Sequence, residues 1–462
     1  MALSGTVPYR TLPAWMYHAQ LPPPDRELNP NLFGVTWVDL IFPFFLFCLG
    51  AAIPLALSPK LERGESDRSI LKGLLGRGLM IAIYALIGQH LRPFVLSDTP
   101  GTGEWVICLV GFVLIGLILL RWPRETPSRW RWIGTATGWV GAAIVIAFWY
   151  YPDETRGFAN YRNDVILMVL ANVAVSGGAV WLITRSRPLI RWTVLAAVAA
   201  IFLTCTVPGL GKSIWDWDPT SYLPFKSGPY GRFLPIFYHF EYHKYLLIVL
   251  PGTFAGDLIR NVNWNASEAS DHASRWARTW LIWAGPLCIS IACGGLMARQ
   301  VPITTVLLLA TVLVSLKLSA LSEEPAEQLA HRLFMLGMPL LVLGLLCEPL
   351  GGGIRKDPAT LSYFLVTSGL GSLALGSLAV AAKGAAQTRL WKSIRDTGTN
   401  PILGYVVITN LTWGIVGITG LEDGINTLTQ NPWLLTTWAL AKTIFVACAT
   451  AWFTRRKLFL RA

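Results

Sequence analysis

Charged residues are scarce in this chain of 462 residues, because Lys, Arg, Asp and Glu make up only 14% of it. Apolar residues make up 53%, and the mean hydropathy is +0.50. A soluble globular protein usually has about 25% charged residues, which cover its surface. The scarcity of charge therefore excludes a soluble protein and indicates a surface that is covered by lipid.

Cysteine and histidine are also few, with seven and six residues. All seven cysteines lie inside or at the edge of apolar runs, without paired loop positions or a metal-ligand spacing. We expect them to be small buried side chains rather than disulfides or zinc ligands. His239 and His243 flank Glu241, but this order differs from that of zinc proteases. The sequence predicts no metal cofactor.

Motifs for nucleotide binding and secretion are absent as well. The sequence has no glycine-rich phosphate loop or dinucleotide fingerprint, and residues 1–32 contain no apolar run of signal-peptide length. The formal net charge of +12 comes from Lys and Arg in short loops between apolar runs, where such residues orient membrane helices. We therefore expect no nucleic-acid partner.

Apolar runs of roughly 20 residues recur from one end of the chain to the other, and each can cross about 30 Å of hydrocarbon as a helix. They predict an all-α, polytopic membrane protein with about 12–14 transmembrane helices, organised as a single domain over residues 1–462. The expected helices are 35–58, 69–90, 104–121, 131–151, 164–184, 188–207, 241–260, 275–297, 301–320, 331–349, 361–382, 401–420 and 433–453.

Basic residues concentrate in alternate loops, which predicts the orientation of the chain. They follow the first, third and fifth expected helices and recur in the C-terminal tail from Arg455 to Arg461. Loops of this kind stay cytoplasmic, so the C-terminus is predicted to be cytoplasmic. His18 and the loop 208–240, which is rich in Trp, Tyr and Asp, are then predicted on the outer face. Residues 1–5 are expected to be the last turn of a truncated first helix.

A histidine in a polar loop, His18, precedes an apolar helix that carries one acid, Asp39. Histidine can take a proton from an attacking amine or hydroxyl near neutral pH, although a loop histidine can also be merely solvated. An acid in an apolar helix is costly and usually faces a polar cavity or a partner. Asp39 is expected to orient the His18 ring or bind a sugar hydroxyl, or else to be stabilised as a carboxylate by the helix N-terminus.

The sequence around these two residues resembles one family of membrane enzymes. His18-Ala19 and the stretch from Gly34 through Asp39 and Pro43 to Gly50 resemble the heparan-α-glucosaminide N-acetyltransferase family, in particular its bacterial relatives. Weaker similarities lie at 163–167, 245–256, 356–363 and 400–405. The resemblance implies that acetyl-CoA is used from the cytoplasmic side of a bacterial inner membrane. It also implies that the acetyl group reaches a sugar acceptor on the outer face and that His18 is catalytic.

Other polar residues in or beside apolar helices are candidates for the same reaction. Arg77 and Asp257 are expected to hold the CoA diphosphate or to pair with each other. Glu241, Lys356 and Asn400 stand at helix ends and are expected to line the substrate path or to cap the helices.

The chain also departs from the pattern of that family. The family's first helix, with an Asn that would fall near Ser4, is not seen in full, and extra crossings are expected around 104–151 and 301–349. Two alternatives stay open. Helices interrupted by proline favour a transporter or a flippase of a sugar-containing substrate, and the chain could be an inactive relative of the enzymes. The expected partners are the bilayer and a glycan, and a homodimer is left open.

Overall fold

The fold is helical throughout the part of the chain that can be described. The structure is a computed structural model that describes residues 12–22, 27–218, 238–264, 275–385 and 388–461, and these residues contain helices and no β-strand. Eleven of their helices are long and apolar enough to cross a membrane, which confirms the all-α polytopic class. Residues 1–5 and most of the loop 208–240 lie outside the described residues.

Each helix expected from the apolar runs corresponds to a helical segment of the structure. The first half contains η2 (Trp37–Leu40), α2 (Ile41–Glu62), α3 (Asp67–His90), α4 (Pro93–Leu96), α5 (Thr102–Leu119), α6 (Ser128–Phe148), α7 (Val165–Thr184), α8 (Pro188–Thr204), α9 (Leu210–Trp215), η4 (Phe240–Tyr245) and α11 (Leu246–Arg260). The second half contains α12 (Arg275–Met297), α13 (Val301–Ala320), α14 (Pro325–Leu346), η5 (Glu348–Gly351), α15 (Leu361–Ala385), α16 (Arg389–Gly398), α17 (Pro401–Val406), the π-helix η6 (Val407–Thr412), α18 (Trp413–Ile418), α19 (Leu421–Leu428) and α20 (Pro432–Arg455).

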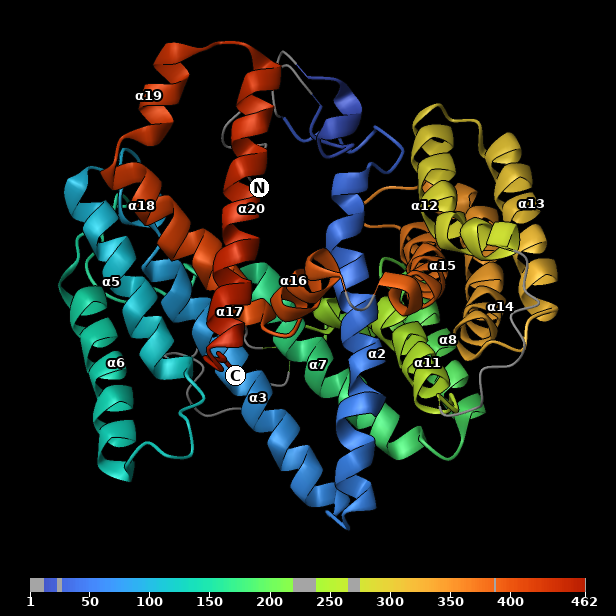
Figure 1. The fold of residues 1–462 in the computed structure, drawn as a ribbon, viewed down its shortest axis with the longest axis horizontal. Helices are drawn as coiled ribbons and strands as arrows, with labels where there is room; N and C mark the ends of the chain where they lie inside the picture. The colour runs from blue at the N-terminus through green and yellow to red at the C-terminus, as the bar shows by residue number, and fades with distance from the viewer. Residues whose placement is uncertain (1–11, 23–26, 219–237, 265–274, 386–387, 462) are drawn as a thin grey trace.

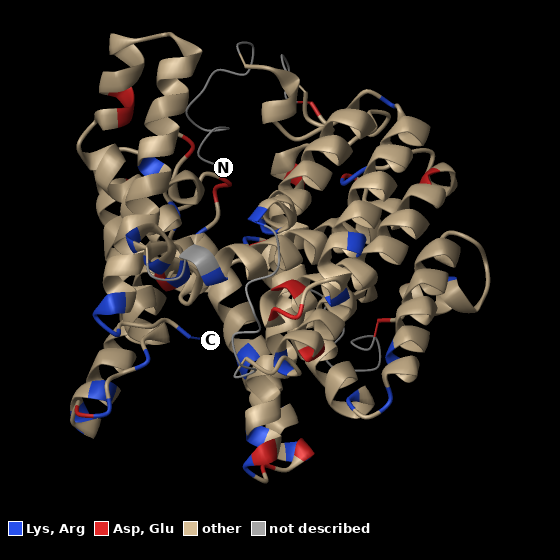
Figure 2. Cartoon of the chain, turned by 45° about the vertical axis from the view of Figure 1, so that its right-hand side comes forward, with Lys and Arg blue, Asp and Glu red and all other residues tan. Residues whose placement is uncertain are grey.

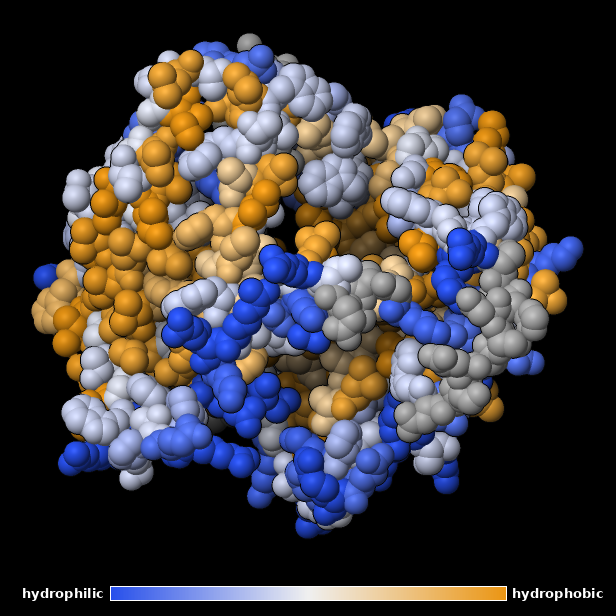
Figure 3. All heavy atoms as spheres, viewed as in Figure 1, coloured by the Kyte–Doolittle hydropathy of each residue, from blue (hydrophilic) through white to orange (hydrophobic). Residues whose placement is uncertain are grey.

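The helices form two groups that are joined through α2, α3 and α7 (Figure 1). One group contains α5, α6 and α17 to α20, and the other contains α8 and α11 to α15. Helix α2 packs against α7, α11 and α15, and α3 packs against α7. The space-filling view shows apolar side chains over α5 and α6, whereas hydrophilic residues gather along the lower edge and near the centre (Figure 3).

Glycines bring α2 and α11 into backbone contact. A Cβ atom on Gly252 would lie 2.2 Å from the carbonyl oxygen of Phe47, and one on Gly256 would lie 2.2 Å from that of Ala51. On the facing helix, a Cβ on Gly50 would lie 2.1 Å from the carbonyl oxygen of Val249. Small residues at four-residue spacing allow membrane helices to approach closely. This contact fixes α2, whose N-terminal end follows Asp39.

Basic loops that are distant in the sequence meet at one end of the molecule. Arg260, at the end of α11, lies 2.7 Å from Glu62, at the end of α2, and Arg185 lies 3.1 Å from Asp67. In Figure 2, Lys and Arg positions, coloured blue, lie at the lower ends of the helices. The grouping agrees with the alternation of charge in the sequence, while the orientation in a membrane stays a prediction.

The seven cysteines are free. Cys108 and Cys288 are buried, as expected, whereas Cys48 and Cys448 are exposed on the surfaces of α2 and α20. The expectation of burial is therefore wrong for these two residues. Both lie on helices that are apolar enough to span a membrane. Their side chains therefore face the surroundings of those helices rather than another helix.

Candidate active site

A short hydrophobic contact holds the loop that carries His18. Leu12, Met16 and Tyr17 are buried against Leu435 of α20, with Ile425 of α19 packed beside them. These residues form a cluster separate from the main core of the protein. The loop is thereby fixed against the α19–α20 hairpin, and His18 follows directly after this contact.

The His18 ring contacts the carboxylate of Asp39. Nδ1 of His18 lies 2.6 Å from Oδ1 of Asp39, whose side chain is fully buried, while that of His18 is 32% exposed. A hydrogen bond to a buried carboxylate fixes both the orientation and the tautomer of an imidazole. The structure thus brings together the two residues that the sequence named as catalytic.

The second carboxylate oxygen of Asp39 is held by the backbone. The N–H groups of Ala19 and Thr36 donate to Oδ2 at 3.1 and 3.0 Å, and Asp39 and Thr36 form a capping box at the start of η2. Asp39 therefore acts as a helix-terminal carboxylate and as the partner of His18 at the same time. The two alternatives from the sequence are compatible, because each uses a different oxygen.

Lys356 approaches the same pair from a distant part of the chain. Its Nζ lies 3.2 Å from Nδ1 of His18 and 3.9 Å from Oδ1 of Asp39. Its backbone N–H donates to Oε1 of Gln20 at 3.3 Å, and the amide of Gln20 donates to the carbonyls of Leu32 and Gly34. The ammonium thus balances the buried charge of Asp39.

Nδ1 of His18 cannot hydrogen bond to both neighbours in the same way. If Nδ1 carries the proton it donates to Asp39, whereas a bond from Lys356 requires it to be an acceptor. We assign the proton to Nδ1, because the contact with the buried carboxylate is the shorter one at 2.6 Å. Nε2 is then an unprotonated nitrogen that is available as a base.

His18 lines a cavity of about 970 Å³ that is enclosed by its own loop, the end of α3, α5, α18 and α19. The opposite wall is aromatic and acidic, with Trp105 from α5, Trp413 from α18, and Glu422 and Asp423 from α19. The end of α3 adds further polar groups from Gln89 and Arg92. Aromatic faces beside acids and amides suit a polar ligand with an apolar face, such as a sugar.

Arg92 is held in place on the cavity wall by two residues from other helices. Its guanidinium donates to Oδ2 of Asp164 at 2.6 Å and to the hydroxyl of Tyr405 at 3.0 Å. The Tyr405 hydroxyl also hydrogen bonds to Asp164. Neighbouring Asn410, in the π-helix, donates to the carbonyls of Leu91 and Cys108. Together these contacts fix the end of α3 at the cavity.

The acid Glu422 is paired with a lysine inside α20. Nζ of Lys442 lies 2.9 Å from Oε2 of Glu422, and the indole N–H of Trp438 donates to the same oxygen at 2.9 Å. Lys442 is 5% exposed, although α20 is one of the eleven candidate membrane spans. This ion pair joins α19 to α20 at the cavity wall, which Glu422 lines.

We expect Lys442→Met to destabilise the protein by roughly 3 kcal/mol, because it leaves the Glu422 carboxylate without its counter-charge in a poorly hydrated place. Adding Glu422→Gln should recover most of that loss, since the double variant is neutral. Thermal unfolding of the detergent-solubilised protein measures both effects. Equal losses in the single and double variants would show that the ion pair is not the cause.

Arg77 lies close enough to Arg121 and Arg461 for their positive charges to interact. The C-terminal segment pairs with the end of α5, where the N–H of Arg121 donates to the carbonyl of Phe459 and that of Arg461 to Leu119. Burial, with the positive charges of Arg121 and Arg77, lowers the pKa of Arg461. Among the described residues these three arginines have no salt bridge.

Asp257 is paired with an arginine other than Arg77. Its Oδ2 lies 2.7 Å from the guanidinium of Arg191, which is fully buried, and its Oδ1 accepts from the indole of Trp181 at 3.0 Å. The pairing of Asp257 with Arg77, one of the two expectations for these residues, is therefore wrong, because Arg191 on α8 is closer. Binding of CoA by either residue stays a prediction.

Two further candidates have their polar contacts with residues other than His18. Asn400 is buried, donates to the carbonyl of Leu458 at 2.8 Å and accepts from the N–H of Leu460 at 3.2 Å, so it holds the C-terminal segment. Glu241 is in η4, where Lys244 lies 2.7 Å from it. Burial, with the charges of Asp357 and Glu241, raises the pKa of Tyr245 to about 12.

The sequence missed much of the cavity wall. Lys442 carried a signal, since a charge in the middle of an apolar run marks a polar cavity or a partner. Arg92, Trp413 and Glu422 carried none, because loops and interfacial positions commonly hold such residues. Their common location depends on how α18 and α19 pack against the end of α3.

No cluster of three or more His, Cys, Asp or Glu residues that could hold a metal ion occurs among the described residues.

Comparison with known proteins identifies one family. Residues 1–259 match the family described as a domain of unknown function (DUF5009), which covers the His18 loop and α2 to α11. No curated protein and no solved structure matches the chain.

Proposed function

We propose that this chain, which belongs to the DUF5009 family, is a membrane-embedded acetyltransferase. It moves an acetyl group from cytoplasmic acetyl-CoA to a sugar or glycan on the outer face of a bacterial inner membrane. The observation that carries the proposal is the 2.6 Å contact between His18 and the buried Asp39, on the wall of a large cavity that also holds polar groups.

The contact with Asp39 gives His18 the properties of a general base. With Nδ1 donating to the carboxylate, Nε2 can accept the proton of an acceptor amine or hydroxyl as that group attacks the thioester carbonyl. A bond forms between the acceptor and the acetyl carbon, the carbon–sulfur bond breaks, and the proton passes from His18 to the CoA thiolate. Alternatively, Nε2 attacks the thioester itself and CoA leaves as the thiolate. The acceptor then takes the acetyl group from Nε2, and its proton passes to the thiolate.

The arginine cluster of Arg77, Arg121 and Arg461 supports a site for the CoA phosphates. Arginines without acidic partners bind phosphate through charge-assisted hydrogen bonds. The cluster lies where α3 and α5 meet the C-terminal tail, in the part of the chain that the charge pattern places in the cytoplasm. The acceptor end and the donor end of the proposed reaction are thus lined by different residues.

We expect Arg77→Gln and Arg121→Gln each to raise the KM for acetyl-CoA about fivefold to tenfold, the loss of roughly one charge-assisted hydrogen bond. The value of kcat should stay the same, since the arginines are remote from His18 in the proposal. Arg63→Gln, which removes an exposed arginine from the loop between α2 and α3, is the control. An unchanged KM in both variants would exclude the cluster as a phosphate site.

Release of CoA by the purified protein in lipid nanodiscs tests the proposed function. Acetyl-CoA is added with a panel of amino sugars and neutral sugars, and free thiol is measured for the wild type and for His18→Ala. We expect thiol release that depends on an acceptor and disappears in the variant. Thiol release that is equal in the wild type and the variant, or absent with every acceptor, would contradict the proposed enzyme. It would favour a transporter or an inactive relative instead.

A further inference from the structure

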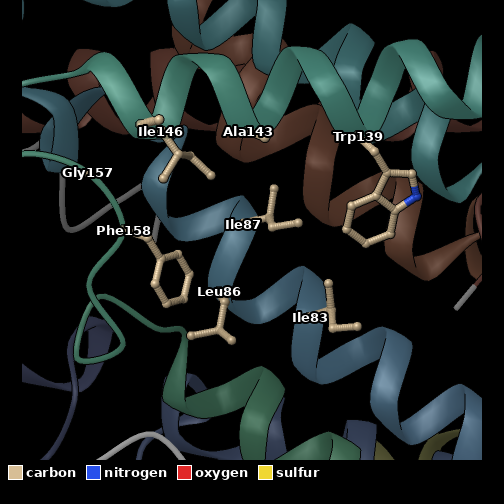
Figure 4. Close-up of a pocket in the computed structure, with 9 residues that line it drawn as sticks. Ile83, Leu86, Ile87, Trp139, Ala143, Ile146, Gly157 and Phe158 are labelled. Carbon is tan, nitrogen blue, oxygen red and sulfur yellow. The ribbon is translucent and has the colours of Figure 1, made fainter. Parts of the chain in front are cut away.

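A second cavity lies between α3 and α6 and is lined by apolar residues. Its volume is about 590 Å³, and its walls include Leu86 and Ile87 from α3, Ala143 and Ile146 from α6, and Phe158 from the following loop. Figure 4 shows Ile87 and Ile146 between the two helices, with Phe158 beside them. We call this cavity the α3–α6 groove.

The α3–α6 groove lies between two candidate membrane spans. Helix α6 packs against α5. The face of α6 that is turned toward α3 does not fill the space between these two helices. The groove is near the C-terminal ends of both helices, which the charge pattern places toward the outer face. At this depth no water is available to fill an apolar space, so the natural occupant is a hydrocarbon chain.

The loop that covers the groove is held firmly. Phe158 stacks on His90 with ring centroids 4.9 Å apart, and Arg162 lies over the ring of Tyr151 at 3.8 Å. The guanidinium of Arg162 also donates to Asp153 at 2.6 Å and holds the pKa of that carboxyl below its usual range. The groove is therefore formed before any ligand binds.

The same end of α3 lines both the groove and the cavity that contains His18. Leu86 lines the groove, and Gln89, one turn later, lines the cavity together with Arg92. Oε1 of Gln89 and Nε of Arg92 are buried without a hydrogen-bond partner. A molecule whose chain occupies the groove would place a polar head beside these two residues.

We propose that the α3–α6 groove binds the hydrocarbon chain of a lipid-linked glycan, whose polar head enters the cavity beside His18. This molecule is the acceptor of the reaction, so that part of the inference rests on the proposed function. Gln89 and Arg92 stand one to two turns beyond Leu86 and offer an acceptor and a donor without a partner, which suits the hydroxyl groups of a glycan head.

Photolabelling tests binding without any turnover. The probe is a polyprenyl phosphate with a diazirine near the end of its chain, added to the full-length protein in nanodiscs, and labelled peptides are identified by mass spectrometry. We expect labelling of α3 and α6 that falls at least about tenfold in Ala143→Trp, because the indole fills the groove. Ile144→Trp, on the neighbouring outward face where Ile144 is 53% exposed, should be labelled like the wild type.

Equal labelling of the two variants would overturn the inference. So would equally strong labelling by a phosphatidylglycerol with the same diazirine, which would make the groove a site for ordinary bilayer lipid. Folding of both variants is checked by size-exclusion chromatography, and Ala143→Phe replaces Ala143→Trp if the latter does not fold.

Kinetics then separate this inference from the proposed function. Ala143→Trp should raise the KM for a polyprenyl-linked sugar about tenfold and leave turnover of a short water-soluble sugar unchanged. Equal effects on both acceptors would contradict the lipid-linked acceptor. If no acetyl transfer occurs with any acceptor, the enzyme proposal fails, whereas specific photolabelling would still establish a polyprenyl site.

Discussion

Replacing His18 by Ala is expected to lower kcat for acetyl transfer by roughly 10³-fold, within the range of 10² to 10⁴ that a general base contributes. The cause is the loss of Nε2, the nitrogen left free when Nδ1 donates to Asp39. KM for acetyl-CoA should change little, because the arginine cluster is remote from this residue in the proposal. Steady-state kinetics in nanodiscs measure both parameters.

Two controls separate chemistry from folding in this experiment. His239→Ala removes another histidine of the predicted outer face, one whose backbone carbonyl rather than its ring contacts His243, and should keep its activity. Thermal unfolding should be nearly unchanged in His18→Ala, since this side chain is partly exposed. A His18 variant that folds and retains more than about a tenth of the wild-type kcat would exclude the general-base role.

Asp39→Asn is expected to give a smaller but related defect. The amide can still accept hydrogen bonds from the backbone of Ala19 and Thr36, so the capping box is largely kept. The His18 ring loses the partner that fixes its tautomer, and the pH profile of kcat should shift along with a fall in rate. A lower stability with an unchanged pH profile would instead indicate a purely structural role for Asp39.

Gly252→Ala is expected to destabilise the protein by about 2–3 kcal/mol or prevent its folding. The added methyl would lie 2.2 Å from the carbonyl oxygen of Phe47 and 3.0 Å from the Cα of Gly50, and both are backbone atoms that cannot move independently. Helices α2 and α11 would have to separate. The measurements are the yield of monodisperse protein and its thermal unfolding midpoint.

Gly116→Ala in α5 is the matched control for this prediction. A Cβ atom there meets nothing within 4 Å, so only the better helix propensity of Ala remains, and stability should rise by roughly 0.5–1 kcal/mol. Equal effects of the two substitutions would contradict the close contact of α2 and α11. If Ala at position 252 were tolerated, the packing of α2 against α11 could not be what fixes the position of Asp39.

The transmembrane helices could be predicted because their lengths follow from bilayer thickness. Each expected apolar run became a helix, although α8 and α11 are short, with 17 and 15 residues. For α11, the polar residues of η4 replace the first turns of a longer helix. The cysteine prediction was wrong at Cys48 and Cys448, because in a membrane protein an apolar side chain can be stable while it is exposed.

The candidate site could be predicted only in part. Proximity in the sequence suggested a contact between His18 and Asp39, while a resemblance named Lys356 without placing it beside them. The partner of Asp257 could not be read from the sequence, because Arg191 looked like one more basic residue of a cytoplasmic loop. The opposite cavity wall requires knowledge of how α18 and α19 pack across from the His18 loop.

Transfer of label across a sealed membrane tests the central proposal most directly. Proteoliposomes are loaded with acetyl-CoA that carries a radioactive acetyl group, and the glycan acceptor is added outside. The orientation of the protein is determined with a cysteine placed near His18. We expect labelled acetyl-glycan outside the vesicles with the wild type and none with His18→Ala. Transfer across the membrane would be contradicted if the acceptor became labelled only when acetyl-CoA and the acceptor were on the same side of the membrane.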